Sequence, residues 1–212
     1  MNFETWMAFT AASCILLILP GPTILTVISY SVSHGHRVKL PLISAVALGD
    51  STALALSLLG LGALLAKSAM WFQIIKWAGG LYLIYLGISL FRSGVSSETL
   101  PETDEDSSSW KLFINTYLVT ALNPKGIIFF VAFLPHFISP HGDTFQQMWI
   151  LAITFVALAT LNALLYAAFA GTARQLLSSP ATRKAFNFTG GTLLTVAGIW
   201  ALSAKRTLQE NM

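Results

Sequence analysis

Two ionisable side chains, Asp50 and Lys125, each lie deep within a long apolar stretch of the sequence. Asp50 is the only Asp, Glu, Lys or Arg between Leu40 and Ala66, and Lys125 is the only one between Leu112 and Gly142. A charge at the centre of a bilayer costs about 2.5–3.5 kcal/mol, so each of these residues is a candidate for function. Removal from water disfavours a charged carboxylate and a nearby cation favours it, so Asp50 is a candidate to gain and lose a proton. The structural alternative is a permanent pair that locks two helices together.

Prolines interrupt two of the apolar stretches close to their centres. Pro20, Gly21 and Pro22 lie near the middle of Trp6 to Ser33, and Asn123-Pro124 lies near the middle of the stretch that contains Lys125. Each proline removes a backbone donor and clashes with the preceding turn, so we expect a broken helix at both places. The alternative at each place is a simple kink, which membrane helices tolerate.

The elements that position these residues are long apolar helices. The chain has 212 residues, of which 55% are hydrophobic and 10% charged, whereas a soluble domain is about 25% charged. The Lys and Arg residues form no patch, which excludes a nucleic-acid-binding surface, and Cys14 is the single cysteine, which excludes a disulfide framework. Six stretches with at most one charge are long enough to span a bilayer: Trp6–Ser33, Leu40–Ala66, Ser68–Phe91, Leu112–Gly142, Thr144–Ala173 and Ala185–Ala204. The sequence therefore predicts an all-α polytopic membrane protein with six transmembrane helices.

A polar segment divides these stretches three and three. Residues 93–110 are rich in serine and contain Pro101 and an acidic run, which is typical of a flexible linker. The predicted organisation is a first three-helix repeat in residues 1–92, the linker in 93–110, and a second three-helix repeat in 111–212.

Matching glycines and small residues indicate an internal repeat. The third and sixth spans share a Gly-Gly pair followed by Gly-Ile, and Gly79-Gly80 and Gly87 lie 111 positions before Gly190-Gly191 and Gly198. Small residues also recur at four-residue spacing in the second and fifth spans: Ala45, Gly49, Ala53 and Ser57, and Ala159, Ala163, Ala167 and Gly171. A repeat of three spans must be inverted, and inverted repeats with broken helices are typical of secondary transporters.

The distribution of Lys and Arg predicts the orientation in the membrane. Seven lie in the odd-numbered loops and four on the other side, which places both termini in the periplasm and the linker in the cytoplasm. The seven are Arg37, Lys39, Arg92, Lys111, Arg174, Arg183 and Lys184, and the four are Lys67, Lys76, Lys205 and Arg206.

Over nearly its whole length the chain resembles the LysE/RhtB family of amino-acid exporters. The motifs that carry the resemblance are Leu19-Pro20-Gly21-Pro22, Gly35-His36-Arg37, Leu48-Gly49-Asp50, Gly60-Leu61-Gly62-Ala63, the stretch from Lys76 to Gly87, Asn123-Pro124-Lys125 and Phe133-Leu134-Pro135. Thr23 and Lys39 depart from the residues usual in the family, Asn and Gly. The first departure bears on which substrate fits, and the second on loop shape. The resemblance implies export of amino acids or close derivatives across the bacterial inner membrane, driven by the proton gradient and without a cofactor.

An amino acid presents a carboxylate and an ammonium, and the candidate residues match both. The broken helices at Pro20-Gly21-Pro22 and Asn123-Pro124 offer N–H groups and a positive dipole end to the carboxylate. Lys125 adds positive charge there, and the amide of Asn123 can donate or accept a hydrogen bond. Asp50 is the only acid at this depth for the ammonium or for a carried proton. The expected partners are this substrate, the proton and membrane lipid, and a homo-oligomer is left open.

Two other classes remain as alternatives. A metal-ion or other small-solute exporter of similar architecture needs a ligand cluster within the spans, where Cys14 and Asp50 are the only cysteine and acid. An intramembrane enzyme needs a motif such as HExxH, GxSxG or a P-loop, and the sequence contains none of these. Asn162 and Tyr166, one turn apart in the fifth span, either line a cavity or hydrogen-bond between helices.

Overall fold

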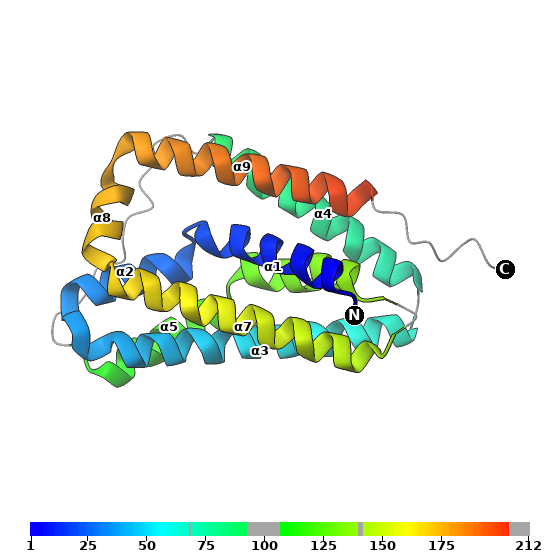
Figure 1. The fold of residues 1–212 in the computed structure, drawn as a ribbon, viewed down its shortest axis with the longest axis horizontal. Coiled ribbons are helices and arrows are strands. Elements are labelled where there is room, and N and C mark those ends of the chain that lie inside the picture. Colours follow the sequence, from blue (N-terminus) through cyan, green and yellow to red (C-terminus); the bar gives the residue numbers. More distant parts are fainter. Residues whose placement is uncertain (68, 93–106, 140–141, 204–212) are drawn as a thin grey trace.

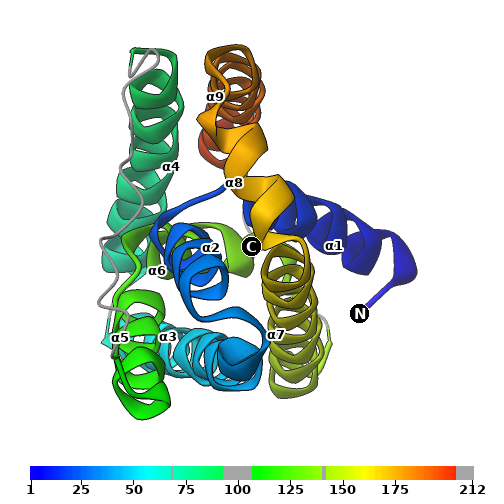
Figure 2. The ribbon, with the colours of Figure 1, turned by 90° about the vertical axis from the view of Figure 1, so that its left-hand side faces the viewer.

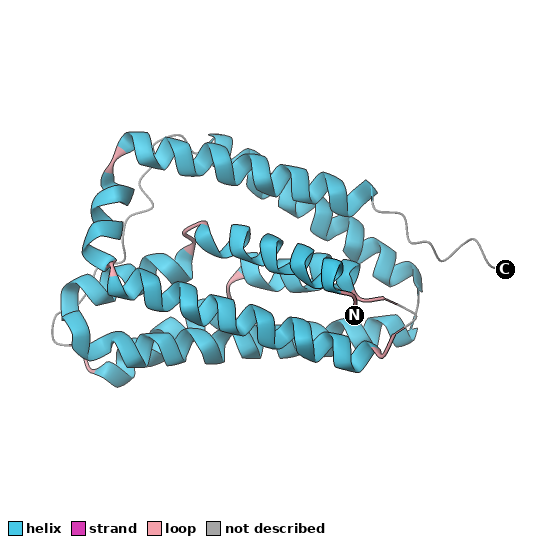
Figure 3. Ribbon diagram, in the orientation of Figure 1, coloured by secondary structure: helices cyan, strands magenta, loops and turns pink. Residues whose placement is uncertain are grey.

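In the computed structural model, residues 1–67, 69–92, 107–139 and 142–203 are described, and they fold into helices joined by short turns, with no strand among them (Figures 1 and 3). The all-α prediction is confirmed for this part of the chain. The elements are α1 (Phe3–Ile18), α2 (Pro22–His34), the 3₁₀ helix η1 (Gly35–Val38), α3 (Lys39–Lys67), α4 (Ala69–Arg92), α5 (Ser109–Ala121), α6 (Pro124–Ile128), the π-helix η2 (Phe129–Phe133), the 3₁₀ helix η3 (Leu134–Phe137), α7 (Thr144–Ala168), α8 (Ala170–Ser178) and α9 (Pro180–Ser203).

The long helices run along the longest axis of the molecule, and α2 lies at their centre. Figure 2 shows α2 surrounded by α3, α5, α7 and α8, while α4 and α9 form a separate pair. All nine residues from Thr23 to Ser31 are buried. The N-terminus and the described end of α9 lie at the same end of the molecule (Figure 1).

Two described helices are long and apolar enough to cross a membrane on their own, α7 and the Lys39–Gly60 part of α3. The α1–α2 pair qualifies as a third span if it is taken as one element bent by 54°. Many large apolar side chains point outward, among them Leu59 and Ile153, which are 71% and 63% exposed. Such a surface is unfavourable in water and is suited to lipid.

The predicted interruption of the first span is observed between Ile18 and Pro22. Leu19 and Gly21 have extended backbone angles, and Pro22 occupies the first turn of α2, where its missing N–H costs nothing. A second interruption separates α5 from α6, where Pro124 again begins the new helix and Asn123 caps it.

The fifth predicted span is too long by five residues. It was expected to continue to Ala173, but α7 ends at Ala168 and α8 begins at Ala170 in a new direction (Figure 1). Phe169 leaves helical geometry with φ −107° and ψ 27°. Gly171 therefore lies on α8, exposed and with open space around it, and is not part of the buried stripe of Ala159, Ala163 and Ala167. Most of the predicted linker, residues 93–106, lies outside the described residues.

The backbones of α4 and α9 touch at the repeated glycines. A Cβ atom on Gly87 would lie 2.6 Å from the carbonyl oxygen of Gly191, and one on Gly198 would lie 2.7 Å from that of Gly80. Because the earlier glycine of each helix meets the later glycine of the other, the two helices cross antiparallel. Only glycine permits this approach.

Six phenylalanines fill the space beyond the second interruption. We call them the phenylalanine cluster: Phe9 of α1, Phe129, Phe130 and Phe133 of η2, Phe137 of η3 and Phe155 of α7. Each is at most 5% exposed, and their rings contact one another at centroid distances of 4.7–6.1 Å. Such edge-to-face and tilted packing holds this side of the bundle together.

Candidate functional site

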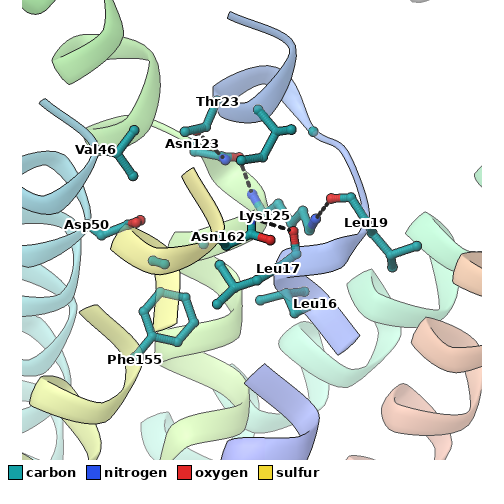
Figure 4. Close-up of a pocket in the computed structure, with 14 residues that line it drawn as sticks. Leu16, Leu17, Leu19, Thr23, Val46, Asp50, Asn123, Lys125, Phe155 and Asn162 are labelled. Carbon is teal, nitrogen blue, oxygen red and sulfur yellow. Dashed lines mark hydrogen bonds between the residues drawn. The ribbon is translucent and has the colours of Figure 1, made fainter. Parts of the chain in front are cut away.

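A small pocket lies where the two helix interruptions meet (Figure 4). Of the residues predicted as a site, it brings together Gly21, Asp50, Asn123 and Lys125. Pro20, Pro22 and Pro124 are not part of its lining and act instead by shaping the interruptions beside it. The other lining residues are Leu16, Leu17, Leu19, Thr23, Ile24, Val46, Gly126, Phe155, Ala159 and Asn162.

Asp50 reaches the pocket from α3. It is 9% exposed, and its carboxylate points from the α3 wall toward the centre of the pocket in Figure 4. Lys125 reaches the same pocket from α6. The structure thus places the deepest acid and the deepest base of the sequence in the same pocket, although they are 75 residues apart.

The ammonium of Lys125 donates a hydrogen bond to the carbonyl oxygen of Leu19, at 2.7 Å. Its side chain passes directly by Gly21, where a Cβ atom would lie 3.6 Å from Cδ and 3.8 Å from Nζ. Lys125 therefore caps the C-terminal end of α1 while it lines the pocket. A cation in this position also balances the negative end of the helix dipole.

Two residues of α7 complete this cap. Asn162 Nδ2 donates to the carbonyl of Leu17 at 3.0 Å, and the Tyr166 hydroxyl donates to that of Ile18 at 2.8 Å. The last carbonyls of a helix have no partner within it, and three successive ones are satisfied here by side chains from other helices. Both sequence interpretations of Asn162 apply, because it lines the pocket and joins two helices.

The second interruption is tied to the first through Asn123. Its Oδ1 accepts a hydrogen bond from the backbone N–H of Lys125 at 3.1 Å, and its Nδ2 donates to Thr23 Oγ1 at 3.2 Å. Thr23 lies in the first turn of α2 and is 8% exposed. Sequence reasoning marked Thr23 only as a departure from the family pattern. Its place directly after Pro22 was the signal that could have assigned it to the site.

The N-terminus of α2 faces the pocket, since Gly21, Thr23 and Ile24 all line it. Backbone N–H groups in the first turn and the positive end of the helix favour an anionic group. Asp50 supplies negative charge from the opposite wall. The pocket therefore offers complementary charge to a small molecule that carries both signs.

The pocket has a volume of about 40 Å³. One water molecule needs about 10–15 Å³ in the same measure, so about three waters fit. A molecule as large as an amino acid requires the walls to move apart. Among the described residues, no three His, Cys, Asp or Glu side chains are grouped as a metal site.

Comparison with known proteins gives relatives that cover nearly the whole chain. The chain is 32% identical over 207 residues to a homoserine/homoserine lactone efflux protein of Salmonella typhimurium. This match covers 97% of the chain and 99% of the relative. It is 31% identical over 205 residues to an uncharacterized membrane protein of Vibrio cholerae, and this match covers 97% of the chain and 100% of the relative. No solved structure shows a significant match. The family profile described as LysE type translocator matches residues 14–205. The chain is a membrane transporter rather than an enzyme, and it belongs to the LysE-type translocator family.

Proposed function

We propose that this protein exports amino acids or close derivatives across the bacterial inner membrane in exchange for protons. The observation that carries the proposal is the pocket at the two helix interruptions, which combines one acid, one base and a helix N-terminus. The relatives named as homoserine and homoserine lactone efflux proteins support a substrate of this chemical class.

In the proposed binding mode, the substrate carboxylate lies at the N-terminus of α2, near Lys125. The substrate ammonium faces Asp50 on the opposite wall. To meet the carboxylate, the Lys125 ammonium must shift its donation from the Leu19 carbonyl toward the substrate. Asp50 exchanges a proton for the ammonium, because burial disfavours the charged carboxylate and protonation removes that cost once the ammonium has left.

The proposed architecture is six spans in two inverted repeats, residues 1–92 and 111–212, joined by the linker 93–110. The antiparallel crossing of α4 and α9 supports it. The offset of 111 residues carries Gly80 onto Gly191 and Gly87 onto Gly198, so that the Gly80–Gly198 contact becomes the Gly191–Gly87 contact. Two antiparallel helices that exchange their contacts in this way are related by an approximate two-fold axis, as in transporters with inverted repeats.

The proposed orientation places both termini in the periplasm. It rests on the seven Lys and Arg residues of the odd-numbered loops against four elsewhere. The common end of the N-terminus and α9 in Figure 1 is consistent with an even number of crossings.

An export assay tests the proposal. Cells that overproduce the protein are loaded with homoserine, other amino acids, dipeptides or divalent metal ions, and efflux is followed with and without a proton gradient. We expect faster efflux of at least one amino acid or derivative, abolished when the gradient is dissipated. Efflux is also measured for Lys125→Gln, which removes the charge from the pocket and should slow it. Lys184→Gln, the same change at an exposed site on α9, is the control and should not. Efflux of metal ions but of no amino acid would support the alternative exporter and overturn the proposal.

A further inference from the structure

Buried polar side chains are concentrated on two helices that meet the pocket at one end. Of the ten buried polar or charged side chains among the described residues, six lie on α2 and α5, which have only 13 residues each. These six are Thr23, Thr26, Ser29 and Ser31 of α2 and Thr116 and Thr120 of α5. The opposite side of the pocket is closed by the phenylalanine cluster, of which Phe155 is also a lining residue.

Polar residues of α2 and α5 follow one another away from the pocket, and Thr120 among them also packs against Gly49 of α3. We call Thr26, Tyr30, Asn115, Thr116 and Thr120 the polar seam. Side-chain hydrogen bonds to α2 lie near both ends of the polar seam. Asn123, the cap of α6 just after α5 ends, donates to Thr23 at the pocket, and Asn115 of α5 donates to Tyr30 near η1. The two residues of α2 that make these bonds, Thr23 and Tyr30, are seven positions apart, so the polar seam is about 10 Å long.

Thr116 occupies the middle of the seam. It is fully buried, and its hydroxyl has no hydrogen-bond partner in the described structure. It shares a helix face with Leu112 and Thr120. Leu112 belongs to the same buried cluster as Tyr30 of α2. Thr120 packs against α3, where a Cβ atom added to Gly49 would lie 2.7 Å from the Cβ of Thr120. The Thr116 side chain is therefore directed toward α2 and α3, into the interior.

Helix packing gives the Thr116 hydroxyl no hydrogen-bond partner. Ser and Thr side chains stabilise membrane helices by hydrogen bonds across the interface, and Thr116 makes none. Burial of a hydroxyl without a partner is unfavourable, so valine, which has the same shape, packs at least as well there. A polar solute that moves between the helices, in contrast, loses hydrogen bonds to water, and hydroxyls such as that of Thr116 can replace them.

We propose that the polar seam between α2 and α5 is the substrate route between the pocket and the end of the molecule at η1, closed in this structure by the Tyr30–Asn115 and Thr23–Asn123 hydrogen bonds. Substrate passes when α2 and α5 separate, and the phenylalanine cluster seals the opposite side. This inference rests on the proposed export of amino acids. With the proposed orientation, the seam is the cytoplasmic entrance.

The test compares two threonines whose hydroxyls are both buried and without a partner. Thr116→Val changes the seam, and Thr195→Val makes the same change on α9, where the hydroxyl lies against Gly87. Purified variants are measured for thermal unfolding and, in proteoliposomes, for homoserine and amino-acid transport. We expect both to unfold at or above the wild-type temperature. Transport by Thr116→Val should fall by about tenfold, the scale of one lost hydrogen bond to the moving substrate, while Thr195→Val transports normally.

A labelling experiment separates passage of substrate from an indirect effect. Cys14 is the only cysteine, so Cys14→Ser gives a background in which Thr116→Cys can be modified by a charged, membrane-impermeant methanethiosulfonate. Reaction at residue 116, slowed by a transported amino acid, is expected, with no reaction for Thr192→Cys on the outer face of α9. Full transport by Thr116→Val, a lowered unfolding temperature, or no reaction at residue 116 in a transporting protein would overturn the inference. Absence of amino-acid transport in the wild type would instead contradict the proposed function, and labelling of residue 116 is still measured in that case.

Discussion

At both helix interruptions a proline begins the new helix, but the two are held in different ways. At the second, Asn123 caps α6 through the N–H of Lys125, and the N–H groups of Leu122 and Asn123 bond back to carbonyls of α5. At the first, Gly21 provides no side-chain cap for α2. The end of α1 depends instead on Lys125, Asn162 and Tyr166, which are more than 100 residues away in the sequence.

This difference indicates which interruption can change during transport. A locally capped helix end keeps its hydrogen bonds when neighbouring helices move. The end of α1 loses its partners if α6 or α7 moves away, so it is coupled to any separation of those helices. The lysine that caps it also lines the pocket, so in the proposed binding mode the substrate competes for the same ammonium.

The largest effect is expected from Lys125→Gln. Glutamine retains a donor for the Leu19 carbonyl but removes the charge, so the protein should still be produced and folded. Hydrogen bonds to charged groups contribute about 1.5–3 kcal/mol, so transport of substrates with a carboxylate should fall by at least about tenfold. Transport of the corresponding amides should fall less, as measured in proteoliposomes. An equal loss for carboxylates and amides would mean that Lys125 serves only as the cap of α1. Lys125→Arg is not a conservative control, because guanidinium and ammonium differ in geometry.

A stability effect is expected from Asn162→Leu. Leucine has a similar size but leaves the Leu17 carbonyl without its donor, at a cost of about 1–3 kcal/mol. Tyr166 lies one turn after Asn162 on α7, and its hydrogen bond to the Ile18 carbonyl is exposed. Tyr166→Phe removes this donor and should cost only about 0.6 kcal/mol. Thermal unfolding of the purified variants gives this ranking. If neither variant is destabilised, the end of α1 does not depend on α7.

The local cap can be tested with two substitutions of Asn123. Asn123→Ala removes the cap of α6 and should cost about 1 kcal/mol, whereas Asn123→Ser retains a capping oxygen and should cost little. Serine is too short to replace the bond to Thr23. Asn123→Ser therefore removes the hydrogen bond that joins the two interruptions and keeps the cap of α6. We expect it to unfold like the wild type and to transport more slowly. Equal destabilisation by serine and alanine would show that the Thr23 bond, rather than the cap, fixes this end.

Several features of the site could be predicted from local sequence. The positions of Pro22 and Pro124 at new helix starts follow from the missing N–H of proline, and Asp50 and Lys125 are conspicuous because apolar residues surround them. The family also followed from the motifs, and the profile match over residues 14–205 confirms it.

Other features depend on contacts that no local pattern contains. The partner of Lys125 is a backbone carbonyl 106 residues earlier in the chain, and any residue type supplies a carbonyl. Ala170 to Ala173 contains no charged residue, so a search for uncharged stretches gave no reason for α7 to stop at Ala168. The π-helix at Phe129–Phe133 supplies three residues of the phenylalanine cluster, and helical periodicity does not signal it.

The central claim is that Asp50 carries the proton that drives export. Asp50→Asn keeps the size of the side chain and removes its ability to change charge. In proteoliposomes of this variant, exchange of labelled for unlabelled substrate should continue, while accumulation driven by a pH gradient should disappear. Asp143→Asn, at the exposed start of α7, is the control and should leave both activities unchanged. Gradient-driven accumulation that persists in Asp50→Asn would contradict the account.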